Sequence, residues 1–439
     1  MSFVNQVICL QNCDEERTEM EKTLSIKRWY RLMPIVFITY SLAYLDRANF
    51  SFGAASNMAH ELAITPAVSS LLGALFFLGY FFFQVPGAAY AEKKSAKKLV
   101  FWSLLLWGGF AASTGVLSDP YQLMIVRFML GVVESVVMPA MLVFLCHWFT
   151  KGERSKANTI LILGNPVTVL WMSIVSGYLL DICGWRMMFI LEGIPPLIWA
   201  FFWNKMVNNH PHEAKWLDKQ EQMDLELALQ AEQKGIKPIK NYAEAFKNKK
   251  VILLCVQYFL WSIGVYGFMM WLPSILKSAP NMTMVLTGWL SSVPYLLAII
   301  GMILASYFSD KFLNRRDFVW PFLFLGAICF YASYIVGTQN FILSYILLVL
   351  AGGMMYAPYG PFFAIIPELL PSNVAGGAMA LINSFGALGS FTGAYAVGLL
   401  NSYTGGYGVS YMLMAISLLL AAGITYYVCT VKKSEGEVQ

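Results

Sequence analysis

An acid and a base stand next to each other inside the first long apolar stretch of the chain. Asp46 and Arg47 both fall within residues 32–55, and Tyr44 precedes Arg47 by three residues, which places it on the same helix face. Ionisable groups in a membrane segment are costly and mark functional sites by default. Consecutive residues of a helix point about 100° apart. We therefore expect Asp46 and Arg47 to face different partners rather than to neutralise each other.

A second acid and base share a later apolar stretch, residues 121–147. Arg127 and Glu134 are seven residues apart, so they lie two helical turns apart on nearly the same face, about 10 Å along the axis. They are either part of a structural ion pair that holds this helix to a neighbour, or an anion-attracting arginine beside a carboxylate that takes up a proton. We favour the second interpretation. Two arginines facing one cavity would hold a carboxylate bidentately.

Polar or amphipathic side chains that suit recognition of hydroxyl groups recur at membrane depth. They are Tyr80, Asn165, Trp261, Tyr266 and Asn383, in addition to Tyr44 on the face of Arg47. Each taken alone is equally compatible with hydrogen bonding between helices or with an interfacial aromatic. The sequence leaves both alternatives open for these residues.

The composition indicates an integral membrane protein. Of the 439 residues, 58% are hydrophobic and only 13% are charged, whereas soluble domains are about a quarter charged, and the mean hydropathy is +0.59. Windows of about 20 apolar residues span the bilayer as helices. The predicted fold is all-α, with twelve spans at about 32–55, 68–90, 98–117, 121–147, 158–181, 186–205, 250–275, 285–308, 317–337, 341–366, 373–400 and 407–430.

The basic residues predict the orientation of these spans. Arg47 and Arg127 lie inside spans, and Arg186 and Lys277 fall on one side of the membrane, while the rest of the 30 lysines and arginines fall on the other side. Basic loops remain in the cytoplasm. Both termini are therefore expected to be cytoplasmic.

The spans divide into two sets of six. We expect an N-terminal tail at 1–31, a six-helix bundle at 32–205, a cytoplasmic loop at 206–249, a second bundle at 250–430 and a tail at 431–439. Within the loop, residues 221–233 are predicted to form an amphipathic surface helix. An acidic residue followed by a basic cluster occurs after the second span and again after the eighth. Such a duplication, with a site between the halves, is typical of transporters.

Several other functions are not supported by the sequence. There is no signal-peptide pattern at the N-terminus, and the seven cysteines form no metal-binding or disulfide pattern. The histidines of the central loop lack a third ligand in the pattern. No catalytic triad or phosphate-binding loop is evident, and the net charge of +5 is not a nucleic-acid signal. We therefore expect no enzyme activity, no cofactor, no metal and no nucleic-acid partner.

These residues resemble the major facilitator superfamily, and within it the anion:cation symporter branch that includes bacterial sugar-acid permeases. The resemblance covers essentially the whole chain. The matching stretches include Tyr44-Leu45-Asp46-Arg47-Ala48-Asn49, Arg127-x₃-Gly131-x₂-Glu134, Gly184-Trp185-Arg186, and Ala375-Gly376-Gly377 with Ile382-Asn383-Ser384. The first two, in the first and fourth spans, are the specific motifs. The loop after the second span departs from the superfamily signature, because Glu92 replaces Asp and Ser95 replaces the central Gly.

The resemblance implies import of a sugar acid with protons across the bacterial inner membrane by a monomeric carrier, and galactonate-like hexonates or hexuronates are the implied substrates. In this reading Arg47 and Arg127 serve the anion, and Asp46 and Glu134 carry protons. The remaining residues line the sugar pocket, namely Tyr44, Tyr80, Asn165, Tyr266 and Asn383. The alternatives are another organic anion, such as tartrate or an aromatic acid, and an exporter or antiporter on the same fold.

Overall fold

The computed structural model describes residues 24, 26–233, 249–312, 315–369 and 372–436. Within these ranges the chain is helical and contains no strand. The first half comprises α2 (Lys27–Ala55), the short α3 (Met58–Glu61), α4 (Pro66–Tyr90), α5 (Ala96–Thr114), α6 (Pro120–Ser135), α7 (Val137–Trp148) and α8 (Lys151–Met206). The second half comprises α11 (Lys249–Lys277), α12 (Met284–Phe312), α13 (Trp320–Val336), α14 (Phe341–Tyr356), α15 (Tyr359–Leu369), α16 (Ser372–Thr404) and α17 (Gly408–Gly436).

These helices confirm the predicted twelve-span fold. Eight helical segments of the described chain have the length and composition to cross a membrane by themselves. One of them, at 156–206, is two spans, because Gly184 adopts a φ of 74° and interrupts α8. The helices α6 and α7 together form one span, and α14 and α15 together form another. The less apolar helices α2, α5 and α16, with 29, 19 and 33 residues, complete the set.

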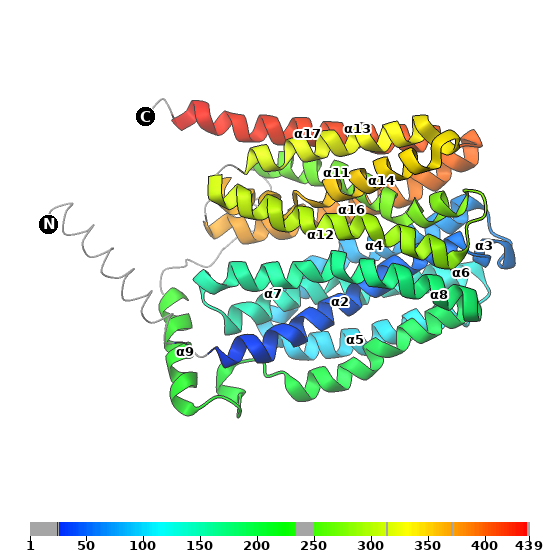
Figure 1. The fold of residues 1–439 in the computed structure, drawn as a ribbon. Coiled ribbons are helices and arrows are strands. Elements are labelled where there is room, and N and C mark those ends of the chain that lie inside the picture. The colour runs from blue at the N-terminus through cyan, green and yellow to red at the C-terminus, as the bar shows by residue number, and fades with distance from the viewer. Residues whose placement is uncertain (1–23, 25, 234–248, 313–314, 370–371, 437–439) are drawn as a thin grey trace.

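The helices form two bundles that lie side by side along a common long axis (Figure 1). Helices α2 to α8 form one bundle and α11 to α17 the other. Across the boundary α4 packs against α16, α8 against α12, and α2 against α11. Helix α9 (Lys219–Gln233) lies at the end of the molecule near both termini, and α3 lies at the opposite end. We refer to these as the α9 end and the α3 end.

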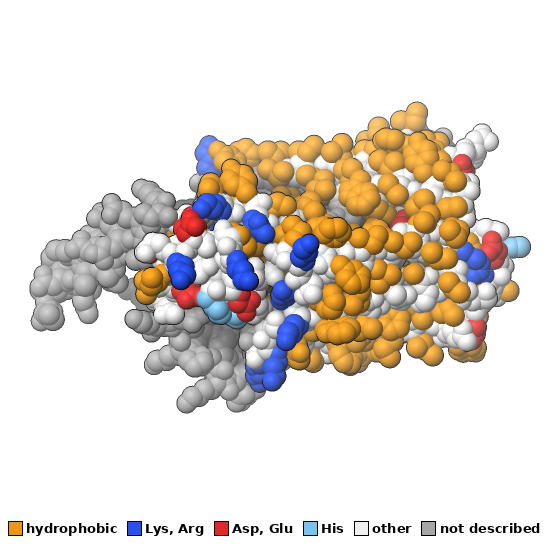
Figure 2. Space-filling model, turned by 90° about the horizontal axis from the view of Figure 1, so that it is seen from below, with side chains coloured by type: hydrophobic (Ala, Val, Ile, Leu, Met, Phe, Trp, Pro, Cys, Tyr) orange, Lys and Arg blue, Asp and Glu red, His pale blue; other side chains and the backbone are white. Residues whose placement is uncertain are grey.

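The outer surface has the polarity of a membrane-spanning protein. Figure 2 shows a broad apolar band over the middle of the molecule, with basic side chains gathered toward the α9 end. Large apolar side chains are exposed on helices of both bundles, among them Trp102, Ile198, Ile303 and Ile335. A lipid environment accepts such side chains, whereas a soluble monomer rarely exposes so much contiguous apolar area.

The helix predicted within the central loop is confirmed as α9. It contacts the beginning of α2, where Lys27 forms ion pairs of 3.4 Å with Asp218 and 3.1 Å with Glu221. The hydrogen bonds that Lys27 donates to Glu221 and Asp218 raise its pKa. The first part of the loop is thereby attached to the first bundle.

Gly288 sets the approach of the two bundles toward the α3 end. A Cβ atom at Gly288 would collide with the backbone carbonyl of Ser173 and lie 3.3 Å from the Cα of Gly177. We predict that Gly288→Ala lowers stability by about 1–3 kcal/mol, as overpacking does. Gly423→Ala is the matched control, because a Cβ there meets nothing within 4 Å. Thermal unfolding in detergent gives the unfolding midpoint of each variant relative to wild type. Equal shifts for Gly288→Ala and Gly423→Ala would contradict the prediction.

Candidate functional site

A buried ion pair joins the first bundle's α2 and α6. The Nε of Arg47 donates a hydrogen bond to Oε1 of Glu134 at 2.6 Å, and Nη2 of Arg47 lies 2.5 Å from the same oxygen. The side chain of Arg47 is 5% exposed and that of Glu134 is 0% exposed. The pair crosses 87 positions of sequence. In this conformation Glu134 occupies the guanidinium that was predicted to bind an anion.

The two predicted arginines share one aromatic ring. The guanidinium carbon of Arg47 lies 5.3 Å from the centroid of Phe76, and that of Arg127 lies 5.5 Å from the same centroid. Arg127 also lies 4.4 Å from the ring of Phe50 and donates from Nε to the carbonyl of Leu72 at 3.4 Å. The structure therefore brings both arginines to one place. Contact with ring faces stabilises a cation where water is scarce.

Two of the predicted tyrosines belong to this cluster. The guanidinium of Arg47 lies 4.4 Å from the ring centroid of Tyr44 and 4.7 Å from that of Tyr80. The hydroxyl of Tyr44 lies 3.3 Å from that of Tyr40, a residue that the sequence analysis did not select. The predicted Tyr266, on α11, is half-buried and packs against Phe77 of α4, with a ring separation of 4.8 Å. It extends the cluster into the second bundle.

For the remaining predicted residues, Asn165, Asn383 and Asp46, we describe no contact with the two arginines. Asn165 on α8 is 8% exposed, and its Oδ1 has no hydrogen-bond partner among the described residues. The same holds for the buried hydroxyl of Thr168, one turn further on. Asn383 is half-buried on α16, and its neighbour Ser384 donates to Gln84 at 3.2 Å across the two bundles. The side chain of Asp46 lies outside the described part of the structure.

A cavity of about 320 Å³ lies beside the cluster, toward the α3 end. It is formed between α2, α4, α11 and α16, so both bundles contribute to its wall. Phe50 lines the cavity and also contacts Arg127. The cluster is therefore adjacent to a hollow but is separated from it by this ring. Within the described chain, no group of three or more His, Cys, Asp or Glu side chains is placed to hold a metal.

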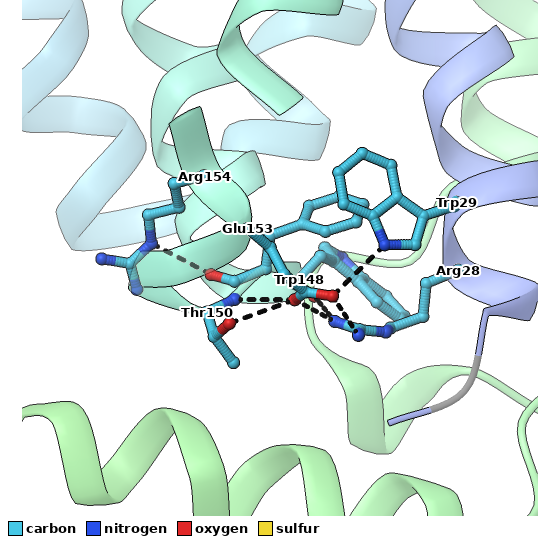
Figure 3. Close-up of polar contacts among 7 residues, drawn as sticks. Arg28, Trp29, Trp148, Thr150, Glu153 and Arg154 are labelled. Carbon is cyan, nitrogen blue, oxygen red and sulfur yellow. Dashed lines mark hydrogen bonds and ion pairs between the residues drawn. The ribbon is translucent and has the colours of Figure 1, made fainter. Parts of the chain in front are cut away.

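A separate polar cluster fixes the α9 end of the first bundle (Figure 3). Arg28 is 1% exposed and donates to both carboxylate oxygens of Glu153, at 3.0 and 2.7 Å, and to the carbonyl of Trp148 at 2.7 Å. Trp29 donates to Glu153 at 3.2 Å, and the backbone N–H of Thr150 does so at 3.1 Å. This cluster joins the start of α2 to the α7–α8 turn.

Phe50 and Phe76 belong to the site but were not predicted from the sequence. Each lies in an apolar run, where a phenylalanine is normally a packing residue. The only available signal was the position of Phe50, one helical turn after Arg47, and the structure shows that its ring contacts Arg127 instead. Phe76 had no signal at all.

The chain matches a known protein family over most of its length. The family model described as Major Facilitator Superfamily matches residues 36–394 and 282–438. The chain belongs to the major facilitator superfamily. It is therefore a multi-pass membrane protein and a secondary transporter rather than an enzyme. The resemblance inferred from the sequence is confirmed at the level of this superfamily.

Several curated members of the superfamily match most of the chain. A quinolone resistance transporter of Acinetobacter baumannii is 29% identical over 93% of this chain and 96% of its own length. A putative tartrate transporter of Agrobacterium vitis is 27% identical over 85% of this chain and 84% of its own. A probable galactarate/D-glucarate transporter of Escherichia coli is 26% identical over 67% of this chain and 70% of its own.

Solved transporter structures show the same fold. A bacterial homologue of the human lysosomal transporter Spinster, in an inward-facing conformation, aligns with a TM-score of 0.75 and 15% identity, over 92% of this chain and 97% of that one. A D-xylose–proton symporter aligns with a TM-score of 0.74 and 15% identity, over 90% and 97%. At these identities the likeness concerns the fold alone.

Proposed function

We propose that the chain imports a sugar acid, a hexonate such as galactonate or a hexuronate, by proton symport across the bacterial inner membrane. The observation that carries this proposal is the cluster of Arg47 and Arg127 around Phe76, with Glu134 bound to Arg47. Two buried guanidinium groups match an anionic substrate. Relatives named for tartrate and for galactarate and glucarate support an organic acid.

The ion pair supplies a mechanism for coupling. The carboxylate of Glu134 and the carboxylate of the substrate compete for the same guanidinium of Arg47. A buried carboxylate that loses its cation is costly as an anion and takes a proton instead. Protonation of Glu134, and of Asp46 beside Arg47 in the sequence, would therefore admit the substrate. Loss of those protons to the cytoplasm would return Arg47 to Glu134 and release the substrate.

The bundles supply the alternating access. The halves at 32–205 and 250–430 rock about the cluster, which receives residues from both sides through Tyr80 and Tyr266. The distribution of basic residues makes the α9 end cytoplasmic, with both termini there, and the α3 end periplasmic. The Oδ1 of Asn165 is buried without a hydrogen-bond partner in the described chain, and it accepts a hydrogen bond from a substrate hydroxyl. Asn383 binds the substrate from the second bundle. One complete set of these residues lies in a single chain, so the transporter acts as a monomer.

The energetics of symport depend on the number of protons carried. One proton moving with one monovalent anion is electroneutral, and a second proton makes transport electrogenic. Each net positive charge that moves inward down the membrane potential releases about 2.3 kcal/mol of free energy per 100 mV. The two proposed proton carriers, Glu134 and Asp46, allow a two-proton cycle, and the dependence of uptake on membrane potential measures the ratio.

Uptake into proteoliposomes tests the proposal. We predict that an acidic outside drives accumulation of a hexonate or a hexuronate above its equilibrium level, and that a protonophore abolishes this accumulation. A thermal-shift panel with hexonates, hexuronates, tartrate and an aromatic acid identifies the substrate class in parallel. Uptake that is indifferent to the pH gradient would contradict symport. Stabilisation by tartrate or an aromatic acid alone would replace the sugar acid by another organic anion.

An exporter on the same fold is the second candidate. It is favoured by the 29% identity to a quinolone resistance transporter, which extends over nearly the whole of both chains. Two buried arginines argue against a cationic substrate. Outward flux of a quinolone in exchange for protons, with no accumulation of any organic acid, would establish this candidate in place of the first.

A further inference from the structure

A vestibule with a few polar groups lies at the α3 end, in front of the arginine cluster. The cavity of about 320 Å³ has Lys277, Ser69 and Ser274 in its wall, together with the aromatic side chains of Trp271 and Tyr407. Its volume is at the lower end of the range for small-molecule sites. Most of the remaining wall is apolar and includes Met270, Pro66 and several alanines. The hydroxyl groups and the one cation can bind the polar groups of a hydroxylated carboxylate, while the rings and the apolar wall pack against its carbon chain.

Of the lysine and arginine side chains described at this end, Lys277 is the one available to a ligand. The other one, Arg186, donates to the carbonyl of Leu117 at 3.0 Å and to the hydroxyl of Ser118 at 3.2 Å, and it lies 3.8 Å from Glu61. These contacts hold Arg186 against the loop between α5 and α6. Lys277 donates to the carbonyl of Met282, and no ion pair of Lys277 occurs among the described residues. An ammonium has three donors, so two remain for a ligand.

Phe50 separates this vestibule from the arginine cluster. The ring is only 2% exposed, and it lies between the cavity wall and the guanidinium of Arg127, 4.4 Å from its centroid. The order along the path is therefore Lys277, the cavity, Phe50 and Arg127. A side chain with two rotatable bonds can swing aside without breaking a hydrogen bond, so the ring is able to act as the barrier between two anion sites.

We propose that the vestibule is a separate capture site for a hydroxylated carboxylate, where Lys277 binds the anion before Phe50 admits it to Arg127. This inference rests on the proposed import of a sugar acid for the identity of its ligand. The location of a positive, accessible site at Lys277 does not depend on that function. The two parts are therefore tested by different measurements.

The first measurement needs no substrate. Ser274→Cys, in a chain whose seven native cysteines are replaced by alanine, is treated with membrane-impermeant thiosulfonates that carry either a sulfonate or a trimethylammonium group. We predict that adding Lys277→Met slows modification by the anionic reagent about fivefold, the effect of one charge at a few ångströms in hydrated surroundings. Lys277→Arg should retain the fast rate. An unmodified Ser274→Cys, or equal rates with lysine and methionine, would overturn the capture site.

The second measurement concerns the ligand. In the same cysteine-replaced chain with Ser274→Cys and Lys277 intact, a hexonate should protect the thiol. In the otherwise wild-type chain, Lys277→Met should raise the KM for external hexonate about three- to tenfold. Lys311→Met, at the α9 end, is the charge-matched control and should leave the KM unchanged. Charge-dependent labelling without hexonate protection would reject the hexonate as the ligand of the vestibule, while the anion site itself would stand and the proposed import would still be decided by uptake into proteoliposomes. Protection with an unchanged KM in Lys277→Met would reject the role of Lys277.

Discussion

Replacement of Arg47 by lysine is expected to reduce hexonate transport, expressed as kcat/KM, by at least about tenfold, and replacement by methionine by about a hundredfold. Lysine retains the charge but loses the planar fork that binds a carboxylate with two parallel hydrogen bonds. It also loses the flat face that lies on the rings of Tyr44 and Tyr80. Uptake into proteoliposomes, normalised to reconstituted protein, gives the ratio, and near-normal transport by Arg47→Lys would remove Arg47 from the substrate site.

The same substitution also tests stability, because Arg47 holds a buried partner. Arg47→Met leaves the carboxylate of Glu134 without its ion pair, and breaking a buried pair costs about 3–5 kcal/mol. Adding Glu134→Leu removes the stranded carboxylate and should restore most of this stability, since a buried pair is often replaceable by apolar groups. Transport should remain absent in the double variant. Recovery of transport together with stability would show that the pair is only structural.

The fold was predictable because its signal is local. A run of apolar residues long enough to cross a bilayer needs no knowledge of its neighbours, and the first predicted span, 32–55, differs from α2 (Lys27–Ala55) only at its polar start. The two predicted spans 158–181 and 186–205 form one helical run in the structure, interrupted at Gly184. The positive φ of that glycine turns the chain without a loop, which hydropathy alone cannot reveal.

The partners within the site were not predictable, because they depend on packing between distant helices. The sequence placed Glu134 on nearly the same face as Arg127, yet its ion pair is with Arg47, 87 residues away. Only the rotation and depth of α2 against α6 decide which guanidinium it meets. The rings of Phe50 and Phe76 gain their role in the same way. Charged residues were found because they are rare in spans, whereas aromatic residues are too common there to stand out.

Glu134→Gln is expected to separate substrate exchange from proton-driven accumulation. Glutamine has the shape of a protonated glutamate and cannot lose its proton, so it cannot return to Arg47 as an anion. The guanidinium then remains open to substrate in every cycle. We predict that exchange of labelled for unlabelled hexonate continues at a rate within about threefold of wild type. Accumulation driven by an acidic outside should fall to the equilibrium level, because the carboxyl group that releases its proton when it returns to Arg47 is gone.

Glu192→Gln is the matched control for this prediction. Glu192 is also a buried carboxylate of the first bundle, 3% exposed, but it accepts a hydrogen bond from Ser176 at 2.9 Å, within the two spans of α8. Loss of its charge should leave accumulation driven by the pH gradient in place. If Glu134→Gln accumulates hexonate as wild type does, the coupling proton is carried elsewhere, and Asp46→Asn becomes the variant that must abolish it. If both glutamine variants lose accumulation equally, accumulation depends on either buried carboxylate of this bundle alike. The competition for Arg47 is then not the coupling step.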